Sequence, residues 1–493
     1  MLDPAQNMAA QCLAHPAEQT AIIDLTGDVR RDVSYGELAD MSDGLARALK
    51  ARVAVGDRVG VLLSQSPWCA AAHLAIWKIG AISVPLFKLF KNVALRSRVS
   101  DAGIEIVLTD PEGAGLLGDL AEPWMVDCVG IAGDVVPMCA VDTETAGVLI
   151  YTSGTTGSPK GALHGHRVLG GHLAGVSASH DHLGQAGDCL WTPADWAWIG
   201  GLFDVLMPGL ALGIPVVAAR MEKFEAAGCA DIIARGEVRN VFFPPTALRM
   251  LRAEGASLVG LRSVASGGEP LGAEMLAWGR EALGVQINEF YGQTECNMTV
   301  SSCGAEFAVR AGCIGKPVAG HDVQVVDAQG QVTAEEGDIA VRRGSPSMML
   351  EYWNRPEATA EKFIGDWMLT GDRGVWEGAY LRFVGREDDV ITSAGYRIGP
   401  AEIEDCLLTH PDVVTVGVVG KPDALRTEIV KAYVVLRDGA VEDAAGLQAY
   451  VKDRLASYSY PREIGFLEAL PMTVTGKVIR KDLKMIAMRE DMQ

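Results

Sequence analysis

Short apolar runs alternate with helical patterns from about residue 57 to residue 295. The runs are rich in β-branched and aromatic residues, which is typical of strands, and they lie within 57–65, 81–87, 104–110, 213–219, 238–245, 261–268 and 285–292. Residues 66–80, SPWCAAAHLAIWKIG, are expected to form one of the helices, because a Ser-Pro start and a final glycine are typical helix boundaries. This alternation predicts an α/β fold with parallel sheets covered by helices.

The pattern changes twice further along the chain. Residues 312–386 are richer in glycine and turns, with short strands, which predicts a small β-rich subdomain. The last part predicts, in order, a helix, two strands and a helix, within 400–410, 413–420, 428–438 and 444–456. We therefore expect a large N-terminal domain of residues 1–387, followed by a small α+β C-terminal domain of residues 388–493.

Composition narrows the class of protein. With 49% apolar and 22% charged residues, a chain of 493 residues can bury a large core, so a globular enzyme of more than one domain is the expected class. The 43 basic residues against 63 acidic ones give a net charge of -20, which argues against binding to nucleic acid or to an anionic membrane. A monomer and a homodimer are both compatible with the sequence.

The cysteines and the chain ends bear on location. The ten cysteines are scattered and show no spacing typical of a metal site, which fits reduced thiols in the cytoplasm. The start, MLDPAQNMAAQCLAHP, has no basic stretch and is not expected to be a signal peptide. The longest apolar runs, 69–87 and 205–219, are interrupted by charged residues, Pro or Gly, so no membrane span is predicted.

The loop YTSGTTGSPKG (151–161) combines glycines, small hydroxyl residues and a lysine directly after an apolar run. Backbone amides, hydroxyls and a lysine can together hold phosphate. A P-loop is excluded because Gly161, not Ser or Thr, follows Lys160. Taken alone, the loop is explained equally well by a flexible turn.

Further motifs follow in a fixed order. They are SGGEPL (266–271), NEFYGQTE (288–295), WMLTGD (367–372), FVGREDDVITSAGYRIGPAEIE (383–404) and PMTVTGKVIR (471–480). Together with the loop, this set resembles the adenylate-forming superfamily, which includes acyl-CoA synthetases, the adenylation domains of peptide synthetases, and luciferases. The resemblance covers most of the chain from 147 to 480 and implies a nucleotide site with ATP, Mg²⁺ and coenzyme A as reactants or cofactors.

The resemblance implies roles for the ATP-binding motifs. The loop over the β- and γ-phosphates comprises Thr152, Ser153, Gly154, Thr155, Thr156, Gly157 and Lys160. The adenine pocket and its surroundings comprise Gly268, Glu269, Pro270, Glu289, Phe290, Tyr291, Gly292 and Gln293. Asp372 is similar to the carboxylate that binds both ribose hydroxyls, with Arg386 assisting, and Arg397 to a residue that contacts phosphates.

Three residues are expected to act in catalysis. Thr294 is similar to the residue that contacts the α-phosphate, and Glu295 to the carboxylate that binds magnesium, a hard ion that prefers oxygen ligands. Lys477 resembles the lysine that enters the site for adenylation and neutralises charge at the α-phosphorus. A surface lysine in a basic tail is the alternative for Lys477.

A moving C-terminal domain is also implied. Asp388 matches the hinge position of the family, and Ala394 and Gly395 are expected to lie beside the pantetheine arm of coenzyme A in a second, thioester-forming pose. Lys452 stands where acetyl-CoA synthetases have an arginine that binds coenzyme A. Lysine keeps the positive charge but lacks the planar guanidinium group that can donate two parallel hydrogen bonds.

The segment WTPADWAWIGG (191–201) resembles the acyl-pocket segment of acetyl- and medium-chain acyl-CoA synthetases. The expected pocket residues are Trp198, Ile199, Gly200, Gly267 and Gly292. Where acetyl-CoA synthetases have threonine, valine and tryptophan, this chain has three glycines, which predicts a pocket deeper than acetate needs. Asp204 is out of register with the aspartate that holds the amino group in peptide synthetases, since that position falls near Gly200. An amino acid substrate is therefore disfavoured.

These inferences give one main hypothesis for the function. The chain is expected to be an AMP-forming acyl-CoA synthetase that acts on a short-to-medium-chain or branched carboxylic acid larger than acetate. An aryl-CoA ligase and an acyl-AMP ligase that loads a separate carrier protein are the alternatives within the family. A non-catalytic nucleotide-binding protein is the alternative from another class, and the presence of Lys477, Glu295 and Asp372 argues against it.

Overall fold

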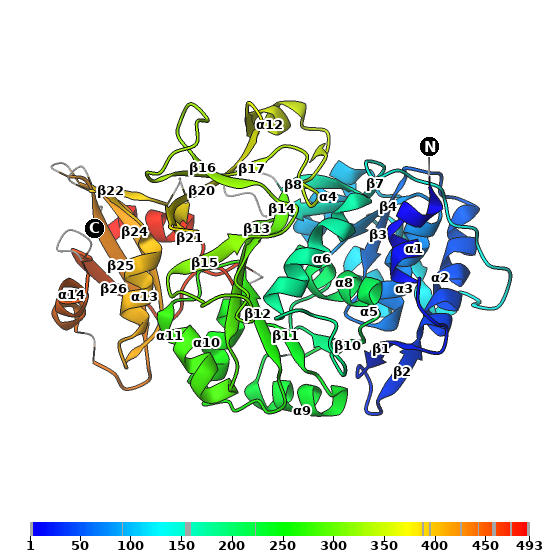
Figure 1. Ribbon diagram of the computed structural model, residues 1–493, viewed down its shortest axis with the longest axis horizontal. Helices are drawn as coiled ribbons and strands as arrows, with labels where there is room; N and C mark the ends of the chain where they lie inside the picture. Colours follow the sequence, from blue (N-terminus) through cyan, green and yellow to red (C-terminus); the bar gives the residue numbers. More distant parts are fainter. Residues whose placement is uncertain are drawn as a thin grey trace.

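The structure is a computed structural model with a large N-terminal body and a smaller C-terminal body at one end (Figure 1). It describes residues 3–90, 92–152, 159–221, 223–386, 389–393, 396–423, 426–441, 443–455, 460–473 and 476–490, with no side-chain description for residues 4, 392, 396 and 397. The expected α/β class is confirmed. The boundary proposed at 387/388 lies outside the described residues and stays a prediction.

The first sheet has a parallel centre that continues into an antiparallel, β-rich part. The edge strand β2(Arg31–Ser34) pairs antiparallel with β1(Thr20–Asp24). From β1 the parallel part continues, in spatial order, through β10(Val216–Ala218), β9(Leu190–Trp191), β11(Asn240–Phe242), β12(Ser263–Gly267) and β13(Ile287–Gln293). The antiparallel continuation is β14(Cys296–Ser301), β15(Cys313–Pro317), β21(Tyr380–Arg386), β20(Trp367–Glu377), β17(Gly337–Arg342) and β16(Val323–Val326), with β19(Phe363–Ile364) beside β20. The predicted β-rich subdomain is thus an extension of the large sheet.

A second sheet lies on the N-terminal side. In spatial order its strands are β18(Glu351–Tyr352), β8(Lys160–Gly165), β7(Ala146–Thr152), β4(Ile82–Pro85), β3(Arg58–Leu62), β5(Ile106–Thr109) and β6(Glu122–Met125). Strands β4, β3, β5 and β6 are parallel to their neighbours. Strand β8 pairs antiparallel with β7, and Thr152 lies opposite Lys160, so these two residues of the predicted phosphate motif are neighbours.

The helices cover these sheets (Figure 1). They are α1(Met8–Cys12), α2(Tyr35–Lys50), α3(Pro67–Lys78), α4(Asn92–Ala102), α5(Pro111–Leu117), α6(Arg167–Ser179), α7(Ile199–Gly201), the π-helical turn η3(Leu202–Leu206), α8(Met207–Leu212), α9(Ala226–Gly236), α10(Pro245–Ala253), α11(Ala273–Trp278), the π-helical turn η4(Gly279–Leu283) and α12(Pro356–Glu361), with 3₁₀ turns η1(Pro4–Gln6) and η2(Val126–Cys128). The predicted helix at 66–80 is α3: the Ser66 side chain accepts a hydrogen bond from the backbone N–H of Cys69, and the helix ends two residues before Gly80.

The small body has a sheet of its own. Its strands are β23(Tyr396–Ile398), β22(Ile391–Ser393), β25(Thr427–Leu436), β24(Val413–Asp423) and β26(Glu463–Phe466), and its helices are α13(Pro400–Leu408), α14(Ala444–Lys452) and α15(Arg480–Glu490). This order matches the predicted helix, two strands and helix. A cluster of buried apolar residues, which includes Ile403, Val418, Ala432 and Val434, gives this body a core separate from those of the large body.

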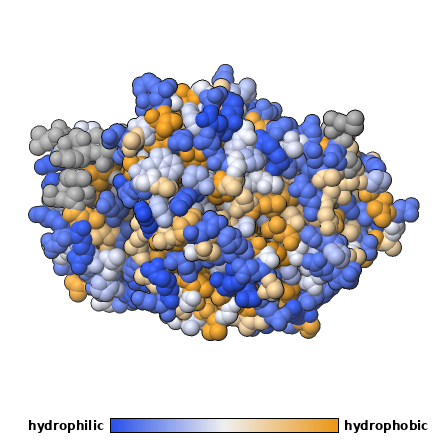
Figure 2. Space-filling model, in the orientation of Figure 1, coloured by the Kyte–Doolittle hydropathy of each residue, from blue (hydrophilic) through white to orange (hydrophobic). Residues whose placement is uncertain are grey.

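The surface agrees with the composition. On the face that Figure 2 shows, hydrophilic side chains surround smaller hydrophobic patches. In the part of the chain that the structure describes, no helix combines the length and the apolar character needed to cross a bilayer. All ten cysteines are free thiols.

Candidate active site

A cavity of about 2010 Å³ lies between the large body and the small one. Its walls come from distant parts of the sequence, including the ends of β12 and β13, the strands β20 and β21, and residues after 471. Because both bodies contribute residues, the site is complete only when the small body lies in this position.

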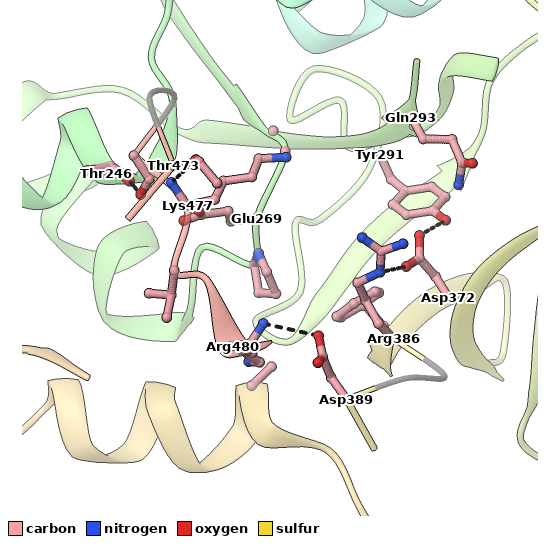
Figure 3. A pocket seen from close by; sticks show the side chains of 18 of the residues that line it. Thr246, Glu269, Tyr291, Gln293, Asp372, Arg386, Asp389, Thr473, Lys477 and Arg480 are labelled. Carbon is pink, nitrogen blue, oxygen red and sulfur yellow. Dashed lines mark hydrogen bonds and ion pairs between the residues drawn. The ribbon is translucent and has the colours of Figure 1, made fainter. Parts of the chain in front are cut away.

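Three side chains from β13, β20 and β21, strands of the same sheet, form one wall (Figure 3). The Tyr291 hydroxyl donates a hydrogen bond of 2.5 Å to Asp372 Oδ2, and Arg386 Nε lies 3.7 Å from Asp372 Oδ1. Asp372 and Arg386 are direct partners in the register of β20 and β21, which fixes their proximity. Burial raises the pKa of Asp372, and the guanidinium of Arg386 opposes that shift. The result is a carboxylate held at the cavity wall, where it can accept hydrogen bonds from a diol.

Lys477 reaches the cavity from the small body (Figure 3). A tight turn positions it: its backbone N–H donates to Thr473 Oγ1 at 3.0 Å, and its carbonyl accepts from the Thr473 N–H at 2.7 Å. The Thr246 hydroxyl on α10 donates to the carbonyl of Gly476 at 3.1 Å and ties this turn to the large body. Desolvation lowers the pKa of Lys477, and the nearby Glu269 opposes that shift.

The loop after β12 is braced by charged side chains. Arg249 donates to Glu269 Oε2 at 3.1 Å and to the carbonyl of Pro270 at 3.0 Å. Glu289 accepts a hydrogen bond of 3.0 Å from the backbone N–H of Leu271, and burial raises the pKa of Glu289 to about 8. Both glutamates line the cavity, but their carboxylates are used to hold the loop in place.

Glu295 is buried at the end of the nucleotide motif. Its carboxylate accepts a hydrogen bond from the hydroxyl of Tyr352, whose ring centroid lies 5.2 Å from Lys160 Nζ. Glu295 therefore lies close to the strand that leaves the predicted phosphate loop. Carboxylate oxygen is a ligand that magnesium prefers, so the residue type and its place in the cavity fit a metal-binding role.

A second lysine lies in the same wall. Lys362 Nζ donates to Gln293 Oε1 at 3.0 Å and to the carbonyl of Leu369 at 3.1 Å. Desolvation lowers the pKa of Lys362, whereas the negative charges of Glu295 and Asp372 raise it. Sequence reasoning missed Lys362 and Tyr352, because neither lies in a motif with recognisable chemistry.

The acyl side of the cavity is aromatic. The rings of Trp198 and Phe242 are 5.9 Å apart, and those of Phe242 and Phe290 are 5.2 Å apart. Lys477 Nζ lies 6.0 Å from the Trp198 ring centroid, so the lysine that is predicted to act in catalysis stands beside this tryptophan. We expected Phe290 in the adenine pocket, but its ring lies among the aromatic residues of the acyl side. Alternation along β13 explains this, because neighbours in a strand face opposite sides.

The three glycines of the acyl pocket do not leave empty space. A Cβ on Gly267 would lie 2.5 Å from the Phe290 ring, and one on Gly200 would lie 2.9 Å from the Trp198 ring. A Cβ on Gly292 would lie 2.6 Å from backbone atoms of Asn297 and Met298. Rings and backbone therefore fill the space where a side chain at these positions would begin, while all three glycines still line the cavity. The expectation that the pocket is deeper than acetate needs stays a prediction.

Comparison with known proteins identifies the family. The profile described as "AMP-binding enzyme" matches residues 8–353, and that of the "AMP-binding enzyme C-terminal domain" matches residues 402–477. The chain belongs to the AMP-binding enzyme family. The acetyl-coenzyme A synthetase of Bacillus subtilis (strain 168) is 31% identical to this family member, covering 93% of this chain and 86% of the relative. The human mitochondrial acyl-coenzyme A synthetase ACSM2B is 36% identical, covering 92% of this chain and 84% of the relative.

Solved structures of similar proteins support the fold of this family member. The anthranilate CoA ligase AuaEII, in complex with anthranoyl-AMP, has a TM-score of 0.89 and 25% identity, covering 100% of this chain and 98% of that chain. ATP-bound MatB from Rhodopseudomonas palustris has a TM-score of 0.85 and 26% identity, with 99% of each chain covered. The resemblance to the adenylate-forming superfamily is thereby confirmed.

Most of the residues predicted for the AMP-binding site meet in the cavity. Those that line it are Thr152, Lys160, Trp198, Ile199, Gly200, Gly267, Gly268, Glu269, Pro270, Glu289, Phe290, Tyr291, Gly292, Gln293, Thr294, Glu295, Asp372, Arg386 and Lys477. Lys452 does not line it: it is the last residue of α14, a helix on the outer side of the small body (Figure 1), and its ammonium lies 5.6 Å from the centroid of the Tyr460 ring. In this arrangement the structure gives the predicted coenzyme A contact of Lys452 no support.

Several predicted residues cannot be placed. Ser153, Gly154, Thr155, Thr156 and Gly157 of the phosphate loop lie outside the described residues. The same holds for Asp388, Ala394, Gly395 and the side chain of Arg397. Their assigned roles in phosphate binding, the hinge and the coenzyme A tunnel stay predictions.

Proposed function

We propose that the chain is an AMP-forming acyl-CoA synthetase. A carboxylate and ATP give acyl-AMP and pyrophosphate, and the thiol of coenzyme A then converts acyl-AMP to acyl-CoA and AMP. One observation carries the proposal: Lys477 of the small body lies in the same cavity as the Tyr291–Asp372 pair and Glu295. This combination places three groups around one cavity: a cation, a carboxylate that can accept hydrogen bonds from a diol, and a carboxylate that can bind a metal ion.

The nucleotide is assigned to the wall formed by β13, β20 and β21. Asp372 accepts hydrogen bonds from the two ribose hydroxyls, and Arg386 and Tyr291 hold its carboxylate in place. The face of Tyr291 packs on adenine, beside the loop that Arg249 and Glu289 brace. This placement directs the phosphates toward Lys160 and Glu295.

In the first step, a carboxylate oxygen of the acid attacks the α-phosphorus of ATP. The bond from that phosphorus to the bridging oxygen breaks, and pyrophosphate leaves with the electron pair. Lys477 offsets the negative charge that accumulates between the two anions, and Thr294 donates a hydrogen bond to the α-phosphate. Thr152 and Lys160 contact the pyrophosphate group.

Magnesium is assigned to Glu295. Its buried carboxylate is held by Tyr352, and both line the cavity near Lys160. A bound magnesium ion supplies neutralising charge to the phosphate oxygens. The protein's own part is to hold the Glu295 side chain in place through Tyr352, oriented toward the phosphates.

The second step transfers the acyl group. The thiolate sulfur of coenzyme A attacks the acyl carbon, a carbon–sulfur bond forms, and AMP leaves with the electrons of the carbon–oxygen bond. We assign this step to a second pose of the small body, with Asp388 as the hinge and Gly395 beside the pantetheine arm. Lys477 is not needed there, because no pyrophosphate is released.

The acid is proposed to be a monocarboxylate, aliphatic or aromatic. The aromatic wall of Trp198 and Phe290, with the ring of Phe242 packed against both, supports an apolar acyl group. The similarity to the acyl-coenzyme A synthetase ACSM2B supports an acyl-CoA product without choosing between the two classes, and that to an anthranilate CoA ligase supports an aryl acid. We also propose a cytoplasmic location, which the ten free thiols support.

The test is a panel of acids. Purified protein is incubated with Mg²⁺, ATP, coenzyme A and straight-chain acids from acetate to decanoate, plus branched acids and benzoate, and AMP and acyl-CoA are measured. We expect AMP and acyl-CoA in equal amounts with at least one acid. Release of AMP without acyl-CoA would point to another acceptor, and no AMP with any acid would refute the proposed function.

A further inference from the structure

A buried carboxyl group lies in the cavity wall on the acyl side. Asp204 stands on the π-helical turn η3, its residue is 2% exposed, and it lines the cavity. Asn297 Nδ2 donates to both of its oxygens, at 2.8 and 3.1 Å. Turns of this kind are rare and often occur at functional sites.

Asp204 stands shortly after the segment of the predicted acyl pocket, and its partner Asn297 lies against Gly292, another residue predicted for that pocket. Asp204 follows Gly200 by four residues along a helical segment, so it faces the same side about one turn further on. Trp198, at the start of the segment, is the residue beside Lys477. An acid whose carboxylate meets Lys477 therefore points its far end toward Asp204.

The surroundings of Asp204 favour its neutral form. Among the described residues, no lysine or arginine forms an ion pair with it, and its nearest basic atom is His172 Nε2 at 3.9 Å. His172 Nδ1 lies 2.7 Å from the carbonyl of Val168, so Nδ1 carries the hydrogen, and burial lowers the pKa of His172 to about 4. Desolvation raises the pKa of Asp204 well above its usual range.

A neutral carboxyl group presents one O–H donor and free acceptor sites. A buried donor without a partner destabilises a complex, so a purely apolar acyl chain is a poor match for this end of the pocket. A cationic group is also a poor match, because it requires an ionised partner in an apolar environment. A hydroxyl group both donates and accepts, and it satisfies a neutral carboxyl group without any charge.

We propose that Asp204, held by Asn297, determines specificity for an acid that carries an uncharged hydroxyl group at the end remote from its reacting carboxylate. This inference rests on the proposed function and narrows its substrate. It also differs from amino-group recognition by the aspartate of peptide synthetases, whose position falls near Gly200 in this chain.

The experiment compares matched pairs of acids. Hexanoate is paired with 6-hydroxyhexanoate, benzoate with 4-hydroxybenzoate, and 6-aminohexanoate supplies a cationic end group. We expect the hydroxylated member of at least one pair to have a kcat/KM at least tenfold above its parent, and 6-aminohexanoate to be poorer than 6-hydroxyhexanoate. Binding of the same acids to the protein without ATP is measured by calorimetry.

Two variants locate the effect. Asp204→Leu keeps a similar volume without polar atoms and should abolish the preference for the hydroxyl while the parent acid is still used. Asp204→Asn keeps a neutral donor and acceptor and should retain the preference for the hydroxyl. If an ionised Asp204 recognised a cation instead, Asp204→Asn would lose that recognition. An unchanged preference in Asp204→Leu, or a wild-type preference for the parent acids or for 6-aminohexanoate, overturns the inference.

Failure of the two proposals can be told apart. If AMP is released with the parent acids but neither rate nor binding favours the hydroxyl, the specificity inference fails and the synthetase function stands. If the hydroxylated acids bind with an Asp204-dependent preference but no AMP appears, the synthetase function fails and the specificity inference stands.

Discussion

Removing the ammonium of Lys477 should separate the two half-reactions. In the structure this group stands in the cavity, where a Cβ on Gly268 would lie 3.7 Å from Lys477 Nζ, and its turn is held by Thr246. A unit charge about 4 Å from an opposite charge in a partly exposed protein site contributes about 4 kcal/mol. Because about 1.4 kcal/mol corresponds to a factor of ten, Lys477→Ala should slow adenylation by about 10³-fold.

The assay measures each half-reaction by itself. Adenylation is followed as pyrophosphate release from ATP and the acid, and thioester formation as acyl-CoA production from synthetic acyl-AMP and coenzyme A. Lys477→Ala should lose the first activity and keep the second within a few-fold. Lys50→Ala, at the exposed end of α2, is the control and should change neither.

The pH dependence provides a further check on the same residue. The pKa of Lys477 is lowered by desolvation, so its ammonium is lost at a lower pH than that of an ordinary lysine. As the pH rises, the rate of wild-type adenylation should therefore fall at a pH below the pKa of an ordinary lysine. The residual adenylation rate of Lys477→Ala should not show this fall. Equal loss of both half-reactions in the variant would refute the assignment of Lys477 to the first step.

Two further predictions concern stability. Gly292→Ala should destabilise the fold by about 1–3 kcal/mol, because its Cβ would lie 2.6 Å from the backbone of Asn297 and Met298. The control is Gly170→Ala, since no atom lies within 4 Å of a Cβ at that position. Equal changes in the free energy of urea unfolding for the two variants would contradict this account. The folded protein holds the proton of Glu289 up to a pH of about 8, against a usual pKa of 4.5, so it binds more protons than the unfolded chain between these values. The free energy of unfolding should fall as the pH rises through this window, and Glu289→Gln should make the fall less steep; each pKa unit corresponds to about 1.4 kcal/mol. Identical pH profiles in thermal unfolding would count against a buried, protonated Glu289.

The ATP wall was largely predictable from the sequence, for a physical reason. Tyr291, Asp372 and Arg386 each stand in a short motif on a strand of one sheet; the pairing of β20 and β21 brings Asp372 and Arg386 together, and the Tyr291 side chain reaches Asp372 from β13. A short sequence motif can predict such a site because the backbone of the strand fixes where each side chain of the motif lies. The same holds for Lys477, which a local turn with Thr473 presents to the cavity.

The acyl pocket was not predictable in the same way. Counting small residues at Gly200, Gly267 and Gly292 suggested free volume, but volume depends on which neighbours move into it. Here Trp198 and Phe290 occupy that space, and they belong to different elements. Tyr352 and Lys362 were missed for a related reason, since only tertiary packing brings them beside Glu295 and Gln293.

Strand β13 separates the two proposed substrate sites by the thickness of one backbone. Tyr291 bonds to the proposed ribose carboxylate on one side, while Phe290, its neighbour in the chain, packs in the aromatic wall on the other. A substitution of Phe290 that reshapes the acyl pocket must therefore also disturb Tyr291, the neighbouring residue on the nucleotide side. The evolution of a new acid preference in this protein is constrained at that strand and freer on the helical segment that carries Asp204, because this segment is not itself a strand of the nucleotide wall.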